Sequence, residues 1–121
     1  MRYAIMTILL LLSIHCRSQT VYATVTCYNP EKRQCDGNPL QTADGSIINM
    51  TLLKRGKLRW CGVSRDLLKT FPFGSKIYVS GKGVYEVHDI SNRRLKRTID
   101  ILEHVNVSMY RHKNIKVKIW K

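Results

Sequence analysis

A β-hairpin in the second half of the sequence places the strongest constraint on the fold. Lys76–Ser80 (KIYVS) and Val84–Val87 (VYEV) are rich in β-branched and aromatic residues, and Gly81-Lys82-Gly83 lies between them. Two such runs joined by a tight, glycine-containing turn are typical of neighbouring antiparallel strands. A β-fold is therefore the first hypothesis for the chain.

Four further segments have the composition or the alternation of strands. They are Tyr22–Tyr28, Leu58–Val63, Thr98–Leu102 and Asn114–Lys121, and Ile47–Leu53 is either another strand or a helical turn. Helix is predicted only for one turn at Ser64–Lys69, with Ser64 as its N-cap, and for a short segment at Glu103–Arg111. Six or seven short strands with little helix predict a mostly β protein, built as a small barrel or sandwich.

The first eighteen residues have the features of a secretory signal peptide. Arg2 precedes an apolar run, Ala4–Ile14, that is short for a membrane span. Cleavage after Ser18 would leave residues 19–121 as one domain, which we expect to be secreted or periplasmic. The alternatives are a retained membrane anchor and a lipoprotein attached through Cys16.

Export would place the cysteines in an oxidising environment. Removal of residues 1–18 leaves Cys27, Cys35 and Cys61, so two can pair and one remains as a thiol. The sequence does not fix the pair, and we take Cys35 and Cys61 as the disulfide candidates because this pairing spares the strand of Cys27. No CxxC spacing with a nearby histidine is present, so neither a metal nor another cofactor is predicted.

The strongly basic composition favours polyanionic partners. The full chain has 21 Lys and Arg against 8 Asp and Glu, and removal of Arg2 and Arg17 leaves 19 against 8, a net charge of +11. Such a surface attracts nucleic acid, anionic lipid or an acidic cell-wall polymer. Export argues against nucleic acid as the natural partner, and solubility with non-specific adsorption is the alternative explanation. We expect a monomer.

Two aspartates at strand ends mark the candidate site. Asp89 follows Val84–Val87, Asp100 lies in Thr98–Leu102, and the basic turn ISNRRLKRT separates them. Carboxylates at strand ends beside a basic loop suit a site better than a core. His88 is a weaker candidate, because strand alternation would place its side chain on the face opposite Asp89.

The segments RWCGVSRDLL, FPFGSKIYVSGKGVYEVHD and RTIDIL occur in this order and at close spacing. Together they resemble the three-aspartate domain of bacterial cell-wall proteins, which is related to membrane-bound lytic transglycosylase A and to rare-lipoprotein-A-like proteins. Asp66, Asp89 and Asp100 match its three aspartates, and the last two keep the spacing of eleven. The chain departs from the family where DISNRRLK replaces a glycine-rich segment, so the shape of this loop is expected to differ.

The resemblance implies a small six-stranded double-psi β-barrel, with one or two short helices, that acts on the glycan strands of peptidoglycan. It implies that Asp100 is the catalytic acid of a lytic transglycosylase, which protonates the glycosidic oxygen and then takes the proton of the sugar's C6 hydroxyl. Burial between Ile99 and Ile101 would favour the protonated acid. Asp89 is the expected catalytic partner, and Asp66 is expected to be structural, in the first turn of a helix.

Substrate contacts are predicted for Tyr28, Asp44, Arg93 and Arg94, with a solvated loop or core role as the alternative for each. Trp60 and Trp120 are further candidates for stacking on sugars, and core packing is their alternative role. Two rival functions remain open. One is a non-catalytic barrel that binds the cell wall or belongs structurally to an envelope or virion, and the other is a glycoside hydrolase with Asp89 and Asp100 as an acid and base pair.

Overall fold

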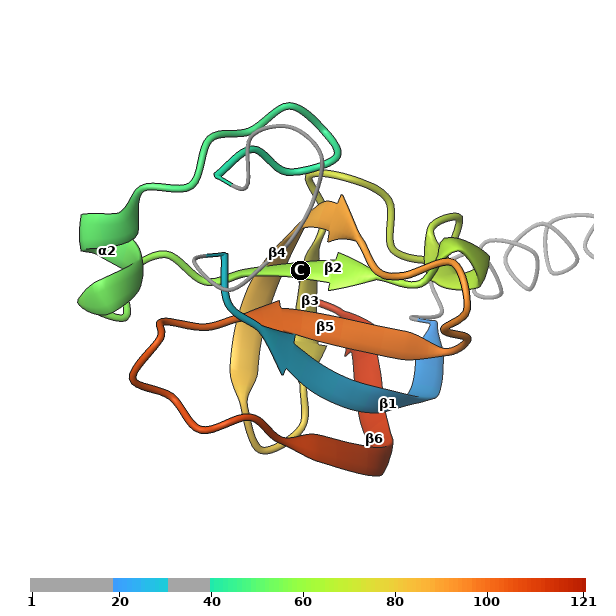
Figure 1. The fold of residues 1–121 in the computed structure, drawn as a ribbon. Coiled ribbons are helices and arrows are strands. Elements are labelled where there is room, and N and C mark those ends of the chain that lie inside the picture. Colours follow the sequence, from blue (N-terminus) through green and yellow to red (C-terminus); the bar gives the residue numbers. More distant parts are fainter. Residues whose placement is uncertain (1–18, 31–39) are drawn as a thin grey trace, which may run out of the picture.

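The computed structural model describes residues 19–30 and 40–121, in which six strands close into a barrel (Figure 1). The strands are β1 (Thr20–Tyr28), β2 (Trp60–Val63), β3 (Lys76–Val79), β4 (Gly83–Ile90), β5 (Thr98–Leu102) and β6 (Arg111–Ile119). Their order around the barrel is β1-β5-β2-β4-β3-β6, and β6 pairs with β1 to close it. The prediction of a small six-stranded β-barrel is confirmed, and the sandwich alternative is wrong.

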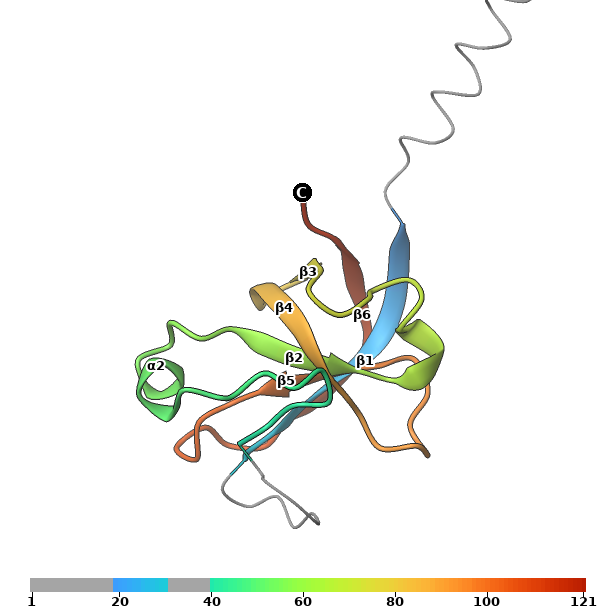
Figure 2. The same cartoon turned by 90° about the horizontal axis from the view of Figure 1, so that it is seen from above.

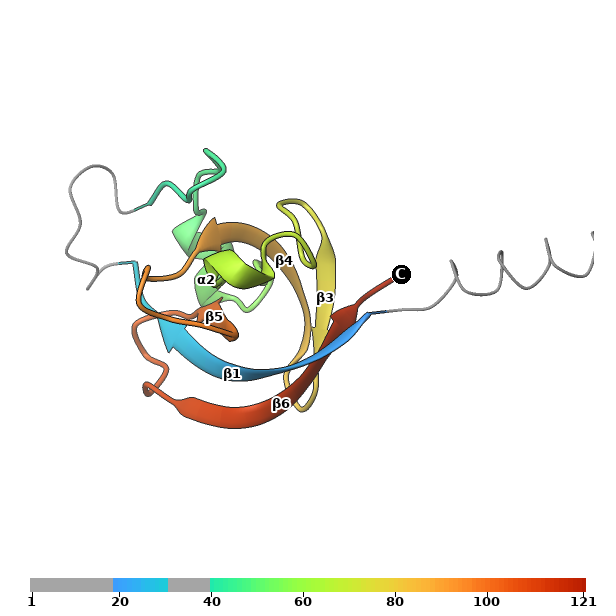
Figure 3. The ribbon, with the colours of Figure 1, turned by 90° about the vertical axis from the view of Figure 1, so that its right-hand side faces the viewer.

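Two of the six strand pairs are parallel. β1 runs parallel to β5 and β2 runs parallel to β4, whereas the remaining neighbours are antiparallel. Parallel neighbours cannot be joined by a tight turn, so both pairs bring distant parts of the chain together. Figure 3 shows β1 and β6 side by side along one wall, with β5 next to β1.

The barrel interior is filled by alternate residues of all six strands. Its wholly buried members include Val25, Val63, Ile77, Val79, Val87, Ile99, Ile101 and Val117, with Phe71 from the segment before β3. The branched residues stand on a pleated surface where they pack well. Each such side chain contributes about 1.5–3 kcal/mol by leaving water.

A second apolar cluster covers part of the outer surface of the barrel. It consists of Ile48, Leu53, Leu58 and Leu102, and Tyr28, Met50 and Trp60 pack against it. The helix α2 (Met50–Lys54) supplies Leu53, and the side chain of Asn49 accepts a 3.1 Å hydrogen bond from the Leu52 amide at its N-terminus. The ambiguous segment 47–53 is therefore helical in its second half, and Figure 2 shows α2 outside the barrel, just before β2.

Of the two helix predictions, the first is confirmed as a short turn. The turn after β2 is the 3-10 helix η1 (Arg65–Leu67), with Ser64 at its N-cap position. The Ser64 hydroxyl makes no capping hydrogen bond to η1, and it accepts a 2.9 Å hydrogen bond from the Thr98 amide. The helix predicted at 103–111 is wrong. This segment is irregular up to Tyr110, since its valines, asparagine and serine favour helix weakly, and the Tyr110 hydroxyl closes it as a loop by donating to Glu103 at 2.9 Å.

The predicted signal peptide with Cys16, and the disulfide candidate Cys35, lie outside the described residues. Within the part of the chain that is described, no helix has the length and the apolar character needed to cross a membrane.

Candidate functional site

The two candidate aspartates stand on either side of one glycine. Gly62 of β2 lies directly opposite Asp89 of β4 and directly opposite Asp100 of β5. On the far side of Asp100, Thr26 of β1 continues the same row. Because neighbouring strands are about 4.8 Å apart, the Cα atoms of the two aspartates are about 10 Å apart. Asp89 and Asp100, which are eleven positions apart in sequence, thus meet at one place on the barrel wall.

A β-bulge brings Asp89 to this place. Cys61 pairs with Val87, but the next residue, Gly62, pairs with Asp89, so β4 carries one extra residue, His88. The bulge reverses the alternation after Val87, whose side chain points into the core. Asp89 therefore lies on the outer face, where its Cβ atom is 3.3 Å from the position that a Cβ atom on Gly62 would occupy.

The carboxylate of Asp89 is buried and accepts hydrogen bonds from three separate segments. The Tyr28 hydroxyl donates to Oδ2 at 2.9 Å, and the amides of Ala43 and Ile90 donate to Oδ1 at 3.0 and 2.9 Å. Only 3% of Asp89 is exposed. These hydrogen bonds fix the carboxylate and connect β1, the segment before α2, and β4. Asp89 is therefore suited to positioning the residues around it.

Asp100 has a different environment. Its Oδ1 atom accepts a 2.8 Å hydrogen bond from the Thr26 hydroxyl, and the residue is partly exposed on the outer face. Ile99 and Ile101 point into the barrel core, so they do not flank the carboxyl group as the sequence suggested. Of the two aspartates, Asp100 is thus the more exposed.

A histidine–aspartate pair lies next to Asp89. His88 Nδ1 is 2.6 Å from Asp44 Oδ2, and the side chains are only 15% and 16% exposed. The Trp60 ring packs against the imidazole, with 4.2 Å between ring centroids. Sequence reasoning selected Asp44 for substrate contact, but it did not foresee this pairing. The argument that set His88 aside assumed regular alternation, which the bulge interrupts.

Asp44 is held as a carboxylate. Partial burial by itself would raise its pKa, but hydrogen bonds from Thr42, His88 and Ser46 outweigh burial and lower the pKa from 3.8 to about 2. The Thr42 hydroxyl donates at 2.7 Å and the Ser46 amide at 3.0 Å, both to Oδ1. An anion fixed in this way orients the His88 ring through its contact with Nδ1.

Asp66 organises the loop between β4 and β5. Its two carboxylate oxygens accept hydrogen bonds of 3.3 and 3.0 Å from the Arg97 amide, where the backbone has φ of 45°. Burial opposes ionisation, but the hydrogen bonds from Ser64 and the Arg97 amide prevail and lower the pKa of Asp66. Arg93 and Arg94 are exposed in the same loop.

Both described cysteines are buried thiols. Cys61 lies wholly inside the barrel, where burial, followed by the charges of Asp100 and Asp89, raises its pKa well above the usual value. Burial also raises the pKa of Cys27. The partner proposed for Cys61, Cys35, is not among the described residues, so their disulfide stays a prediction. A partner for Cys61 would have to reach the barrel core.

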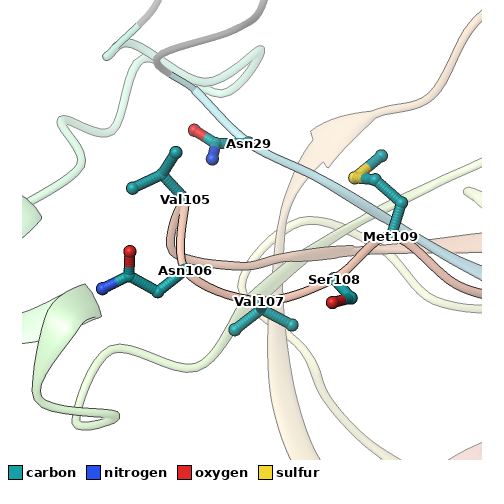
Figure 4. Close-up of a pocket in the computed structure, with 6 residues that line it drawn as sticks. All are labelled: Asn29, Val105, Asn106, Val107, Ser108 and Met109. Atoms are coloured by element: carbon teal, nitrogen blue, oxygen red, sulfur yellow. The ribbon is translucent and has the colours of Figure 1, made fainter.

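Two polar features near the aspartates had no signal in the sequence. The Ser91 hydroxyl, two residues after Asp89, is buried without a hydrogen-bond partner in the described structure. A hollow of about 240 Å³ lies where β1 ends, between Asn29 and the 105–109 loop (Figure 4). Its lining residues are Asn29, Val105, Asn106, Val107, Ser108 and Met109. None of them is ionisable, so the hollow is suited to contact rather than to proton transfer.

In residues 19–30 and 40–121, no group of three or more His, Cys, Asp or Glu side chains is arranged to hold a metal ion.

Comparison with protein-family models and with curated proteins finds no match to the chain. The function therefore has to be inferred from the residues and their contacts.

Proposed function

We propose that the protein is a peptidoglycan lytic transglycosylase of the cell envelope, with Asp100 as its catalytic acid and base. The observation that carries the proposal is the contrast between the two aspartates beside Gly62. Asp89 is almost fully buried and accepts three hydrogen bonds, whereas Asp100 is partly exposed. One carboxyl group is fixed in place and the other is accessible to a glycan on the same face of the barrel.

The reaction needs only one accessible carboxyl group. Protonated Asp100 donates its proton to the glycosidic oxygen while the bond from this oxygen to C1 breaks. The C6 hydroxyl oxygen of the same sugar then bonds to C1, and the Asp100 carboxylate takes the hydroxyl proton. No water is consumed, the acid is regenerated, and the product carries a 1,6-anhydro ring. General acid–base catalysis of this kind contributes about 10²–10⁴-fold to a rate.

Neighbouring residues support this chemistry. The Thr26 hydroxyl holds one oxygen of Asp100 and so sets the direction of the other. Asp89 keeps β4 and the end of β1 together beside the reacting group through Tyr28. The exposed cations Arg93 and Arg94 lie in the loop that joins β4 to β5, where they would contact carboxylates of peptide stems.

The test compares the purified protein with its Asp100→Asn and Asp66→Asn variants. Each is incubated with intact peptidoglycan and with peptidoglycan freed of stem peptides, and the soluble products are identified by mass spectrometry. Anhydro-muropeptides from the wild type and from Asp66→Asn, but not from Asp100→Asn, are the expected result. Asp66→Asn is a matched control, because it also removes one carboxylate next to the same loop.

Other outcomes would replace the proposal. Products with ordinary reducing ends would indicate a hydrolase that uses both aspartates. If no product forms and all three proteins sediment with the wall, the protein is a binding barrel. Equal activity of Asp100→Asn and the wild type would remove Asp100 from the chemistry.

A further inference from the structure

A face with exposed aromatic and lysine side chains lies on the wall of the barrel formed by β1, β6 and β3. We define this aromatic–lysine face by Tyr22, Tyr78, Lys116, Lys118 and Trp120. Lys116 lies directly opposite Tyr22 of β1, and Lys118 lies directly opposite Tyr78 of β3. Val117, between the two lysines, is wholly buried in the core, so both lysines are on the outside.

Two aromatic rings of this face are stacked on each other, and two are exposed. Tyr78 and Trp120 have centroids 5.8 Å apart with 30° between their planes, and the Lys118 ammonium lies 5.8 Å from the Tyr78 centroid. Trp120 is 47% exposed and Tyr22 is 56% exposed. The Trp120 amide donates to the Lys76 carbonyl at 2.8 Å, which fixes the tryptophan at the edge of the sheet. Exposed rings of this size on a fixed backbone are typical of a contact surface.

The charged side chains of Asp, Glu, Lys and Arg type in β1, β3 and β6 are all positive. The strands β1, β3 and β6 contain no aspartate or glutamate, whereas β6 alone contributes Arg111, Lys113, Lys116 and Lys118. Alternate residues of a strand are about 6.7 Å apart, so Lys116 and Lys118 form a short row of positive charges along β6. A polymer with one negative charge per repeat can follow this row, while its sugar rings stack on the neighbouring aromatic rings.

The face is remote from the proposed catalytic residues. Thr26 of β1 pairs with Asp100 on one side and with Arg111 of β6 on the other. Trp120 lies nine residues further along the chain than Arg111, so it is far along β6 from the row that contains Asp100. A glycan strand lying beside Asp100 would therefore not cover Trp120. A ligand on the aromatic–lysine face is a second polymer, or a second region of the wall.

We propose that the aromatic–lysine face binds an anionic glycan of the cell envelope, a polymer of sugars with phosphodiester or carboxylate groups. The choice of an envelope polymer rests on the proposed function, whereas the anionic, ring-containing chemistry rests on the face itself. Bound in this way, the protein stays on the wall while the surface beside Asp100 remains open to peptidoglycan.

The test measures binding of the purified protein to isolated cell walls by sedimentation. Walls are used untreated, after acid extraction of phosphodiester polymers, or after amidation of polymer carboxylates. The variants are Lys116→Ala/Lys118→Ala and Trp120→Ala. The matched control is Lys54→Ala/Lys57→Ala, which removes the same charge from exposed positions at α2. Unfolding midpoints confirm that every variant is folded.

We expect Trp120→Ala to weaken binding about tenfold, because the exposed ring on which a sugar would stack is lost. The double lysine variant should weaken binding about tenfold at low salt, with a smaller difference at high salt. The control should change binding less than twofold. Loss of binding after only one of the two wall treatments would identify which anionic group is recognised.

Three results would overturn the inference. They are equal weakening by the control, unchanged binding after both wall treatments, and tighter binding of single-stranded DNA that depends on the same residues. Cleavage of short soluble glycan fragments separates this inference from the proposed function. The face variants should cleave them at the wild-type rate, whereas Asp100→Asn should bind walls normally without cleaving.

Discussion

The Tyr28 hydroxyl donates a 2.9 Å hydrogen bond to Asp89 and so connects the end of β1 with the end of β4 across 61 positions of sequence. Asp89 also receives the Ala43 amide, and its main chain lies against Gly62. Four segments of the chain therefore meet at this residue. Perturbing these contacts should affect both the stability of the barrel and the geometry beside Asp100.

Tyr28→Phe removes a donor from a buried carboxylate while it keeps the ring against the outer apolar cluster. We expect a loss of about 1–3 kcal/mol in the free energy of unfolding, because a buried acceptor loses one of its partners. The rate at which soluble muropeptides are formed from peptidoglycan should also fall, because Asp89 becomes less well fixed. Urea unfolding and muropeptide analysis measure the two effects. Tyr22→Phe, at an exposed position, is the control, and equal behaviour of the two variants would contradict the positioning role of Asp89.

Gly62→Ala places a methyl group between the strands of the two aspartates. Its Cβ atom would lie 3.3 Å from three atoms of Asp89, two of them in the main chain, so the strand has to move. We expect about 1–3 kcal/mol of destabilisation from this crowding, together with a loss of activity. In Gly56→Ala the Cβ atom meets nothing, so its cost should come from the φ of +72° alone and activity should persist. A fully active Gly62→Ala would show that the spacing of the aspartates is unimportant.

The lowered pKa of Asp44 predicts that the protein loses part of its stability in acid. Because its pKa is lowered from 3.8 in the unfolded chain to about 2 in the barrel, it stabilises the fold above pH 4, and this contribution disappears as the pH falls from about 4 to about 2. After allowance for solvent screening the contribution is about 1 kcal/mol. Asp44→Asn should lose this amount at pH 7 and should show a weaker decline between pH 4 and 2. Thermal unfolding at several pH values tests this, and an identical slope for both proteins would refute it.

Asp66→Asn should loosen the loop between β4 and β5 without changing the reaction. The Asp66 carboxylate holds the Arg97 amide, and the loop contains four basic residues that trypsin recognises, Arg93, Arg94, Lys96 and Arg97. We expect about 1 kcal/mol of destabilisation and faster cleavage by trypsin after these residues. The muropeptide products should be those of the wild type. A stable variant without activity would instead place Asp66 in the catalytic machinery.

The thiol of Cys61 should be unreactive in the folded protein. Burial inside the barrel, reinforced by Asp100 and Asp89, raises its pKa, so little thiolate forms at neutral pH and no reagent reaches it. A thiol reagent should modify Cys61 only after unfolding. Failure to react even in the unfolded, unreduced protein would support the disulfide with Cys35, which peptide mapping without reductant would identify. Rapid labelling of the native protein would contradict the burial of Cys61.

The strands could be predicted from local composition, but their ends could not always be. Thr98–Leu102 agrees with β5 at both ends, because an apolar run lies there between polar turns. β4 continues beyond Val87 to Ile90 because Gly62 pairs with Asp89 at the bulge. Likewise β6 begins at Arg111 because this residue pairs with Thr26, a contact that local sequence does not reveal.

The candidate site was predictable in its residues but not in its contacts. Asp89 and Asp100 could be singled out as carboxylates associated with predicted strands, and the structure places both beside Gly62. Asp100, however, is the central residue of β5 and does not lie at a strand end. His88 and Asp44 are 44 positions apart, and their pairing depends on the path of the chain before α2. A bulge has no signature in a single sequence here, so the face occupied by Asp89 could be learned only from the strand pairing.

The parallel pairing of β1 with β5 also determines when the protein can fold. β1 is the first of the described strands to emerge from the ribosome, yet its neighbours in the barrel are β5 and β6, the last two. Contacts such as Thr26 with Asp100 span 74 positions, and closing such long loops makes folding slow. The barrel consequently cannot close before β6 has left the ribosome, and the contact between Thr26 and Asp100 cannot form before β5 has left it.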